Sequence, residues 1–514
     1  MRTNNTIRNI FAGLTNKIIV LFVPFLVRTV LVNKLGVNYV GVSSLFTSIL
    51  DVLNVTELGF SAAIVFSLYD PVARNDIQEI KKQVNLLASV YKFLGILVLA
   101  IGLIITPFLP QLVKDDIPDD INLYIAFLIF LMNPVISYLF YGYKNSILIV
   151  YQRNDLVSKI HSLTSLIKGI IQLIVLYTVK DFYLYSIIIP CTTLLGNLLV
   201  NQLSNHYFPE LCEKSVFSFE GIGKLKKQIA GVAIGRISLV CRNSFDSIIL
   251  TALFGLAVTG IYSNYYMVFS LVCGFMSVLI TSIAAGVGNS LVTETKEKNE
   301  SDHLRFDFYY MFTASLCSIC LFCLYQPFMK VWVGDDFMLP YSSMILFCVY
   351  FYVNQLAQIR GAYSQAAGLW WSFKYLSFTE MLANLVLNVL LGCILGVDGI
   401  LIATIITAFL CSFIGCTVIT YKKIFEKSSR IYFVYNIYYM IVAAIGCLSV
   451  NYFTSKFLVE CWLDLFIKAL LCAFLSFSYL LLVYGLNRNT RADIFALINK
   501  LKCFLKNNTA VERR

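Results

Sequence analysis

Apolar stretches of about 20 residues recur along the whole chain, and this recurrence constrains the fold more than any other feature of the sequence. A helix of that length can cross the roughly 30 Å of hydrocarbon in a bilayer. Because lipid offers no hydrogen-bond partner to exposed backbone groups, such stretches must be helical. The sequence therefore predicts an all-α integral membrane protein.

The composition agrees with this interpretation, since 59% of the residues are hydrophobic and 13% are charged, against about 25% charged in soluble proteins. About fourteen transmembrane helices are expected, and they leave no separate extramembrane domain. The expected spans are 7–32, 40–66, 83–106, 120–143, 158–178, 184–204, 229–253, 260–288, 306–330, 341–360, 374–395, 400–421, 431–451 and 462–486.

The basic residues predict the orientation of the chain in the membrane. The formal net charge is +11, but Lys and Arg lie in short segments between apolar stretches, which argues against a nucleic-acid partner. Most of them fall on the side of the N-terminus, and the opposite segments hold Lys34, Lys114, Lys180, Lys330 and Lys456. By the positive-inside rule, both termini are expected in the cytoplasm. The tail 487–514, which alternates apolar and basic residues, is expected to lie on the anionic inner leaflet.

No pattern of an enzyme or a metal site is found in the sequence. It has three histidines, no phosphate-binding glycine loop and no nucleophile elbow. Cys317, Cys320 and Cys323 have helical spacing without a carboxylate or His cluster, so we interpret them as packing residues. The first apolar stretch is too long for the core of a signal peptide. We expect a transporter without metal or cofactor, apart from a coupling proton or Na⁺.

Weak self-similarity relates the two halves of the chain. One constant offset aligns Lys17 with Arg236, Ile18 with Ile237, Leu31 with Leu250, Gly36 with Gly255, Gly41 with Gly260 and Ser44 with Ser263. Because this offset covers six spans, an even number, the copies should enter the membrane from the same side, related by an axis along the membrane normal.

The expected domains are an N-lobe of six helices (1–204), a cytoplasmic linker (205–228), a C-lobe of six helices (229–421), two further helices (422–486) and a cytoplasmic tail (487–514).

Seven basic residues remain inside the expected spans when those at the first two or last positions of a span are counted with the loops, and an unpaired charge there costs several kcal/mol. They are Lys17, Arg28, Lys92, Lys168, Arg236, Arg242 and Lys468. Lys92 and Lys468 lie near span ends and are expected to extend toward the headgroups. The other five, together with Asn243, are candidates for contacts to a cargo.

Polar residues form stripes along six of the expected helices, at spacings that place each set on one face. The second helix carries Ser44, Thr47, Ser48, Asp51 and Asn54, and the fifth carries His161, Thr164, Ser165, Lys168 and Gln172. The remaining stripes are Thr6, Gly13, Lys17, Pro24 and Arg28 on the first helix; Gly235, Ser238, Arg242 and Asp246 on the seventh; Ser263, Ser270, Gly274, Ser277 and Thr281 on the eighth; and Ser377, Glu380, Asn384 and Asn388 on the eleventh. We expect these stripes to line a hydrated cavity whose cationic character favours a phosphate or diphosphate. Helix packing alone, and a self-neutralising pair of Arg242 with Asp246, remain alternatives.

Four carboxylates inside the spans are candidates for an ion-coupling site: Glu380, Asp246, Asp51 and Glu57. Glu57 is the least favoured, because it lies off the polar stripe near the inner end of the second helix, where capping or a lobe contact is an equal alternative. Glu380 has no basic residue within four positions and lies in the middle of its span, so it is the preferred candidate for binding a proton or Na⁺.

Several motifs resemble those of the polysaccharide transporters, the repeat-unit flippases of capsule, O-antigen and exopolysaccharide pathways within the multidrug, oligosaccharidyl-lipid and polysaccharide (MOP) flippase superfamily. The motifs are Gly36–Phe46 with Gly41; Glu57–Ala63 with Gly59; Ser67–Pro71; Arg242–Asp246; Gly260–Tyr266 with Asn264; Trp332–Asp336 with Gly334; and Asn384 followed by Gly396–Ile400. Many relatives carry a charged pair where this chain has Trp371 and Ser372.

The resemblance implies two six-helix lobes around a central cavity, plus two extra C-terminal helices. It implies a flippase in the bacterial cytoplasmic membrane that moves a polyprenyl-diphosphate oligosaccharide to the outer leaflet by alternating access, for surface polysaccharide biosynthesis. Its expected partners are that lipid-linked oligosaccharide and membrane lipids, and a polysaccharide polymerase or chain-length protein is left open. A drug or metabolite exporter of the same superfamily is the first alternative, and a membrane-bound polymerase or glycosyltransferase is the second.

Overall fold

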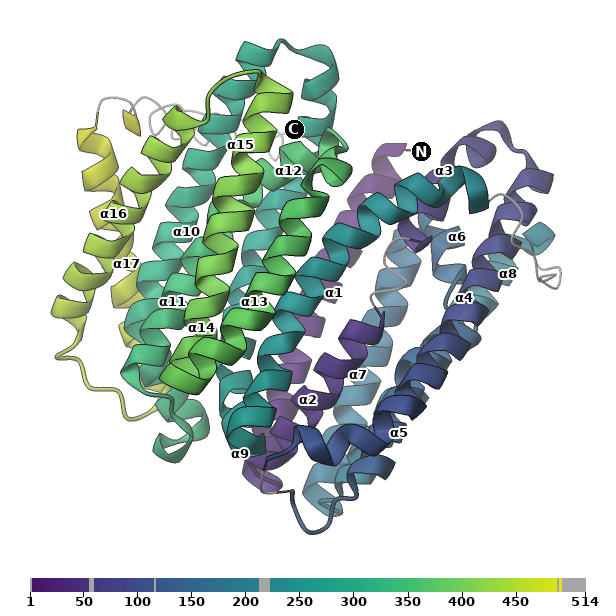
Figure 1. Ribbon diagram of the computed structural model, residues 1–514, viewed down its shortest axis with the longest axis horizontal. Helices are drawn as coiled ribbons and strands as arrows, with labels where there is room; N and C mark the ends of the chain where they lie inside the picture. The colour runs from purple at the N-terminus through teal and green to yellow at the C-terminus, as the bar shows by residue number, and fades with distance from the viewer. Residues whose placement is uncertain (1, 55–59, 115–116, 212–221, 488–489, 492–514) are drawn as a thin grey trace, which may run out of the picture. The chain divides into compact units, whose positions relative to one another are not determined.

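The computed structural model describes the chain except residues 1, 55–59, 115–116, 212–221, 488–489 and 492–514 (Figure 1). Almost all described residues are helical and none forms a strand, which confirms the predicted all-α fold. The contacts between residues divide the protein into two compact units. Unit 1 comprises residues 1–267 and 377–400, and unit 2 comprises residues 268–376 and 401–514. The boundaries expected for the two lobes stay a prediction.

The helices follow one another with short connections. They are α1 (Arg2–Lys34), α2 (Val37–Asn54), α3 (Phe60–Arg74), α4 (Ile77–Ile105), α5 (Leu123–Leu139), α6 (Lys144–Val150), α7 (Asn154–Thr178), α8 (Phe182–Tyr207), α9 (Ile222–Thr293), α10 (Lys296–Val333), α11 (Tyr341–Leu356), α12 (Gln358–Ala366), α13 (Lys374–Leu395), α14 (Val397–Thr407), α15 (Cys416–Thr420), α16 (Arg430–Thr454) and α17 (Trp462–Leu486). Two π-helical segments, Ala408–Gly415 and Tyr421–Phe425, flank α15.

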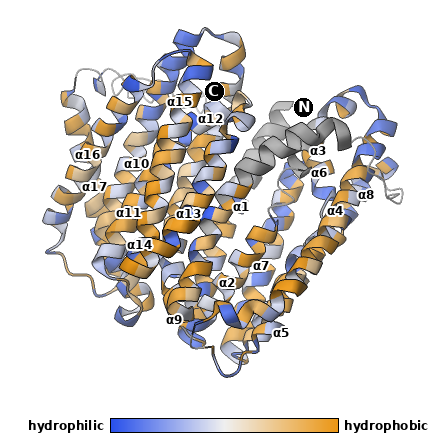
Figure 2. Ribbon diagram, in the orientation of Figure 1, coloured by the Kyte–Doolittle hydropathy of each residue, from blue (hydrophilic) through white to orange (hydrophobic). Residues whose placement is uncertain are grey.

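Eleven helical stretches among the described residues are long and apolar enough to cross a membrane, or twelve if the bent pair α5 and α6 counts as one span. The outward faces agree with lipid contact: Leu463, Phe466, Leu470 and Phe474 of α17 recur every three or four residues and are 58–69% exposed. Figure 2 shows hydrophobic residues covering the helices, with hydrophilic residues concentrated near helix ends and connections. The protein is therefore a multi-pass membrane protein, and the count of fourteen spans stays a prediction.

One of the eleven candidates is too long for a single crossing. It covers Val240–Thr293, 54 residues, which at 1.5 Å per residue is about 80 Å. Gly255 interrupts α9 with a φ of 83° and a ψ of −178°, a conformation that residues with a Cβ rarely adopt. The expected spans 229–253 and 260–288 lie on either side of this break. The expected span 40–66 includes residues 55–59, which lie outside the described part of the chain.

The break at Gly255 supports the internal repeat. Gly36, its counterpart in the first copy, also has a positive φ, 111°, and lies in the turn that joins α1 to α2. The α1–turn–α2 unit thus corresponds to the two parts of α9 before and after Gly255. Both copies therefore change direction at an equivalent glycine.

Within unit 1, α2 packs against the segment of α9 that follows Gly255. The contacting residues of the two helices occupy equivalent positions in the two copies of the repeat. A Cβ added to Gly41 would lie 2.1 Å from the backbone oxygen of Leu256, and a Cβ added to Gly260 would lie 2.2 Å from the backbone oxygen of Val37. Leu256 and Val37 are themselves counterparts in the two copies. The hydroxyls of Ser44 and Ser263, another pair of counterparts, meet at 2.6 Å. This reciprocal pattern indicates a local two-fold relation between the copies.

Also within unit 1, α1 and α7 run in the same direction, packed side by side. Near one end Ser162 Oγ donates to Asn16 Oδ1 at 3.1 Å, and near the other the Lys34 ammonium lies 5.1 Å from the centroid of the Tyr177 ring. Between them, a Cβ on Gly169 would lie 2.3 Å from Val23, so glycine permits close approach. This packing fixes the register of the polar stripes on the two helices.

In unit 2, α10 is the central helix and packs against α11, α16 and α17. The buried Asp307 of α10 accepts hydrogen bonds from Asn436 Nδ2 at 3.0 Å and from the Tyr432 hydroxyl at 3.2 Å, both on α16. One turn earlier on α10, the ring of His303 meets the Tyr421 hydroxyl at 3.2 Å. These contacts tie the core of unit 2 together through polar groups.

Candidate functional site

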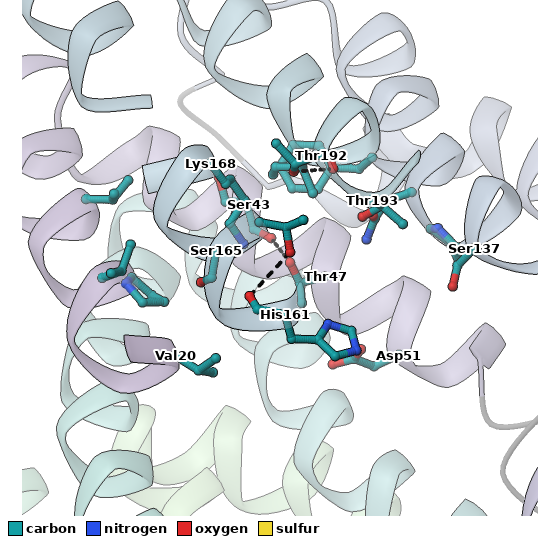
Figure 3. A pocket seen from close by; sticks show the side chains of 18 of the residues that line it. Val20, Ser43, Thr47, Asp51, Ser137, His161, Ser165, Lys168, Thr192 and Thr193 are labelled. Atoms are coloured by element: carbon teal, nitrogen blue, oxygen red, sulfur yellow. Dashed lines mark hydrogen bonds between the residues drawn. The ribbon is translucent and has the colours of Figure 1, made fainter. Parts of the chain in front are cut away.

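A cavity of about 1210 Å³ lies within unit 1 and is lined by α1, α2, α5, α6, α7, α8 and part of α9. Figure 3 shows its side chains from close by: Lys168, Ser165 and His161 come from α7, and Ser43, Thr47 and Asp51 come from α2. Most lining residues are hydroxyl, amide or charged side chains with a smaller number of apolar ones. In a membrane protein such a lining marks a pathway or binding site for a polar ligand.

Helical periodicity explains why α2 and α7 contribute so much. Every residue of the two stripes predicted on these helices lines the cavity: Ser44, Thr47, Ser48, Asp51 and Asn54 on α2, and His161, Thr164, Ser165, Lys168 and Gln172 on α7. The spacing of three or four residues keeps each set on one face, and the packing of α1, α2 and α7 turns both faces toward the same space.

Arg28 and Lys168 supply the positive charge of the cavity. Arg28 Nη1 donates to Ser263 Oγ at 3.2 Å. Among the described residues, no carboxylate forms an ion pair with Arg28 or Lys168. Two such cations create a site that attracts an anion, and the guanidinium of Arg28 matches the geometry of phosphate oxygens.

The other predicted cargo residues are placed differently. Lys17 and Arg242 do not line this cavity. Arg236 and Asn243 lie in α9, where their side chains fall outside the described part of the structure. Asp51, predicted as an ion-coupling residue, does line the cavity and faces the same space as Lys168.

Arg242 belongs to a second, buried polar cluster of unit 1, between α9 and α13. Its Nη1 donates to Glu380 Oε1 at 2.6 Å, with both side chains about nine-tenths buried or more. The candidate cargo residue Arg242 and the preferred coupling residue Glu380 thus form one ion pair. The sequence did not predict this ion pair, because the two residues are 138 positions apart.

Asp246 lies in the same cluster and is buried. It accepts hydrogen bonds from Asn388 Nδ2 at 2.7 Å and from the Tyr262 hydroxyl at 3.3 Å, and Asn388 also donates to Asn384 Oδ1 at 3.2 Å. The stripe expected on 374–395 therefore faces α9, and its residues do not line the cavity. Among the described residues, no group of three His, Cys, Asp or Glu side chains is arranged to hold a metal ion.

The cavity also has polar residues that the sequence interpretation missed. Asn133, Ser137 and Tyr138 come from α5, and Thr193 and Asn197 come from α8. Thr193 Oγ1 donates to Asn133 Oδ1 at 2.6 Å, which joins the two helices across the lining. The spacing of Asn133 with Ser137, and of Thr193 with Asn197, is four residues, so the same periodicity would have revealed both stripes.

The glycines named as structural in the sequence have clear roles where the structure describes them. Gly36, Gly255 and Gly334 adopt positive φ angles, while Gly41 and Gly260 form the close contact described above. The buried Asn264 and Trp332 lie in α9 and α10. Glu57 and Gly59 lie outside the described residues.

The fold is similar to that of solved transporters. The lipid II flippase MurJ in an inward closed conformation matches with a TM-score of 0.63 and 13% identity, over 93% of this chain and 99% of that chain. An inward-facing multidrug resistance MATE family transporter of the MOP superfamily matches with a TM-score of 0.57 and 12% identity, over 77% of this chain and 93% of that chain. A MOP superfamily transporter from Pyrococcus furiosus matches with a TM-score of 0.54 and 15% identity, over 82% of this chain and 96% of that chain.

At such identities the structural matches show the fold alone. Comparison with curated protein sequences gives no match. A family model described as "Polysaccharide biosynthesis protein" matches residues 6–284, more than half of the chain. The protein therefore belongs to the polysaccharide biosynthesis protein family and has the fold of the MOP superfamily of flippases and transporters.

Proposed function

We propose that this protein is a flippase that carries a polyprenyl-diphosphate oligosaccharide from the inner to the outer leaflet of a bacterial cytoplasmic membrane. Family membership supports a place in polysaccharide synthesis, and the fold similarity to a lipid II flippase supports movement of a lipid-linked cargo. The flipped unit would then be available for assembly into a surface polysaccharide. Both termini would lie in the cytoplasm.

The cationic cavity of unit 1 is the observation that carries this proposal. A diphosphate leaving water for a membrane interior needs charged hydrogen-bond donors around it. Arg28 and Lys168 provide such donors, and Arg28 also donates to the hydroxyl of Ser263, which accepts from Ser44. The volume of about 1210 Å³ exceeds the upper range of ordinary small-molecule pockets, about 1000 Å³. That size suits a cargo with several sugar rings.

Energy coupling is assigned in this proposal to the membrane-embedded carboxylates. No nucleotide-binding motif occurs in the sequence, so an ion gradient would bias the alternating states. Protonation or Na⁺ binding at Glu380 would compete with its ion pair to Arg242, and Asp246 and Asp51 provide further carboxylates. Binding of the ion would thereby change the net charge of the buried polar groups of unit 1.

A gene-deletion strain tests the proposed function. Without the protein, lipid-linked oligosaccharide should accumulate on the cytoplasmic face, because synthesis continues while translocation stops. Enzymatic labelling of the sugars from either side of membrane vesicles measures this sidedness, and complementation with the intact gene is the control. Normal surface polysaccharide in the deletion strain would overturn the proposal.

Export of a drug or metabolite is the second candidate, because the fold also matches a multidrug resistance MATE family transporter. An exporter of cationic drugs would need carboxylates facing its cargo, whereas the described lining has the two cations Arg28 and Lys168 against the single carboxylate of Asp51. Greater drug sensitivity of the deletion strain together with normal surface polysaccharide would favour the exporter.

A further inference from the structure

The cavity has two chemically different ends, a consequence of the register of α1 and α2. At one end Arg28 contacts Ser263, which also meets Ser44 at 2.6 Å. Asn54 lies ten residues beyond Ser44 along α2, about 15 Å away, and Asn16 lies twelve residues before Arg28 along α1, about 18 Å away. A short turn reverses the chain between α1 and α2. The path back along α1 from Arg28 to Asn16 and the path forward along α2 from Ser44 to Asn54 therefore lead toward the same end of the cavity. The end with Arg28 is called the cationic end, and the end with Asn16 and Asn54 is called the amide end.

Two asparagines of the amide end contact neighbouring hydroxyl groups. Asn16 Oδ1 accepts from Ser162 Oγ at 3.1 Å, and Asn54 Oδ1 accepts from the Tyr138 hydroxyl at 3.2 Å. The Tyr138 contact occupies the amide oxygen of Asn54 and leaves an NH₂ group that has no acceptor among the described residues. The Ser162 hydroxyl has one proton, which it also donates to the backbone oxygen of Ser158 at 2.9 Å, so Asn16 supplies an amide whose two polar ends are both suited to a ligand. An NH₂ group in a cavity lining can donate two hydrogen bonds to a ligand.

Asn197 at the same end is oriented the other way. Its Nδ2 donates to the backbone oxygen of Ser137 at 3.5 Å, next to Tyr138 in the chain, so its amide oxygen is the group left to accept. The amide end therefore combines donors and an acceptor with an aromatic ring. Sugar hydroxyls both donate and accept hydrogen bonds, and sugar rings carry apolar faces that pack on aromatic side chains, so this combination fits a carbohydrate.

The charge of the amide end limits which carbohydrate fits. Asp51 lies three residues before Asn54 on the same face of α2, and it is the only carboxylate among the lining residues that the structure describes. His161 of α7, next to Ser162 in the chain, and the phenol of Tyr138 are further titratable groups there. An acidic sugar at this end would face Asp51, and like charges at short range repel.

We propose that the amide end is a subsite for the neutral sugars of the cargo, separate from a diphosphate subsite at the cationic end. This inference rests on the proposed flippase function and adds to it a substrate class: oligosaccharides whose diphosphate-proximal sugars are uncharged, such as hexoses and N-acetylhexosamines. Asn16, Asn54 and Asn197 contact the sugar, and Asp51 excludes uronic acids.

The test is a binding measurement on the full-length protein in lipid nanodiscs with three probes: undecaprenyl diphosphate, the same lipid carrying N-acetylglucosamine, and the same lipid carrying glucuronic acid. The intact protein should bind the N-acetylglucosamine lipid most tightly. Asn16→Leu and Asn54→Leu, which keep the side-chain volume, should each weaken that binding by about two- to tenfold and leave the sugar-free diphosphate unaffected. Asp51→Asn should reduce discrimination against glucuronic acid. Arg28→Gln, the matched variant at the cationic end, should weaken all three lipids alike.

The possible outcomes distinguish failure of the subsite from failure of the flippase function. Equal binding of all three lipids by the intact protein, or an equal loss of sugar-free and sugar-bearing lipids in the Asn variants, would overturn the sugar subsite while leaving the proposed function in place. Failure of the intact protein to bind any of the three diphosphate lipids would overturn the proposed function, and the subsite with it. Unchanged binding of the sugar-free lipid also shows that an Asn variant is folded.

Discussion

Arg28 and Lys168 are the residues on which the cationic character of the cavity depends, because no carboxylate pairs with either among the described residues. Such charges are costly inside a membrane protein unless water or an anion compensates them. A buried guanidinium also differs from an ammonium, since its planar fork can donate two hydrogen bonds to one phosphate. Arg28 is therefore expected to bind the cargo in a way that Lys cannot fully replace.

Substitution of Arg28 tests this assignment. Arg28→Ala should lower transport of a diphosphate-linked oligosaccharide in proteoliposomes by about tenfold or more, because a charged hydrogen bond is lost. Arg28→Lys should retain part of the activity, and Lys92→Ala, a basic residue of α4 outside the cavity lining, is the matched control. Equal activity of Arg28→Ala and the intact protein would contradict the assignment.

The ion pair of Arg242 with Glu380 is expected to contribute to stability. Removing one partner of a buried pair leaves an uncompensated charge, so Arg242→Ala should lower the free energy of unfolding by about 3–5 kcal/mol. Glu380→Gln in the same chain should restore part of this loss, because it removes the orphaned carboxylate. Thermal unfolding in detergent micelles measures both variants. An unchanged unfolding temperature for Arg242→Ala would contradict the pair.

Glu380→Gln alone tests the coupling proposal. Because Glu380→Gln leaves the charge of Arg242 without its partner, its unfolding temperature should fall. If Glu380 exchanges an ion, the folded variant should still bind cargo but lose the stimulation of transport by an imposed proton or sodium gradient. Cargo movement without a gradient is the control. Full gradient-driven transport by Glu380→Gln would leave Asp246, Asp51 and Glu57 as the remaining candidates.

Among the helices of unit 1, α2 and α9 are held in a close contact. Gly41 and Gly260 each face a backbone oxygen, which cannot move aside as a flexible side chain could. Gly41→Ala and Gly260→Ala should each destabilise the protein by about 1–3 kcal/mol or more, since an added methyl group overpacks the contact. Because the two positions are equivalent, their effects should be similar in size.

The matched control for these variants is Gly13→Ala, a helical glycine with nothing within 4 Å of an added Cβ. Fluorescence-detected size-exclusion chromatography after heating gives the unfolding temperatures. A stable Gly41→Ala together with a stable Gly260→Ala would contradict the close contact.

Every residue of the polar stripes predicted on α2 and α7 lines the cavity, because a stripe on one straight helix maps directly onto one face; the lining residues Ser43 and Ile160 were not part of these stripes. The same rule failed for α9: the expected stripe through Arg242 and Asp246 faces α13, and Ser244 and Ser247 line the cavity in its place. The partner of a buried charge comes from a distant part of the chain, and spacing along one helix cannot identify it.

For the molecule as a whole, the repeat and the fold class could be derived from the sequence, while the arrangement of long-range polar pairs could not. The offset between the copies aligned Gly36 with Gly255, and both adopt the positive φ that a Cβ disfavours. The helix count is harder to obtain, because the break at Gly255 leaves no loop and two expected spans appear as one continuous α9.

The cavity of unit 1 is proposed to bind a diphosphate-linked oligosaccharide for translocation across the membrane. The most direct measurement places the purified protein in proteoliposomes with a fluorescent undecaprenyl-diphosphate oligosaccharide and follows its appearance in the opposite leaflet by quenching with a membrane-impermeant reagent. The intact protein should accelerate translocation over empty liposomes, and the Arg28→Ala and Lys168→Gln double variant should reduce the rate to that of the empty liposomes. Translocation by the double variant at the rate of the intact protein would contradict the account.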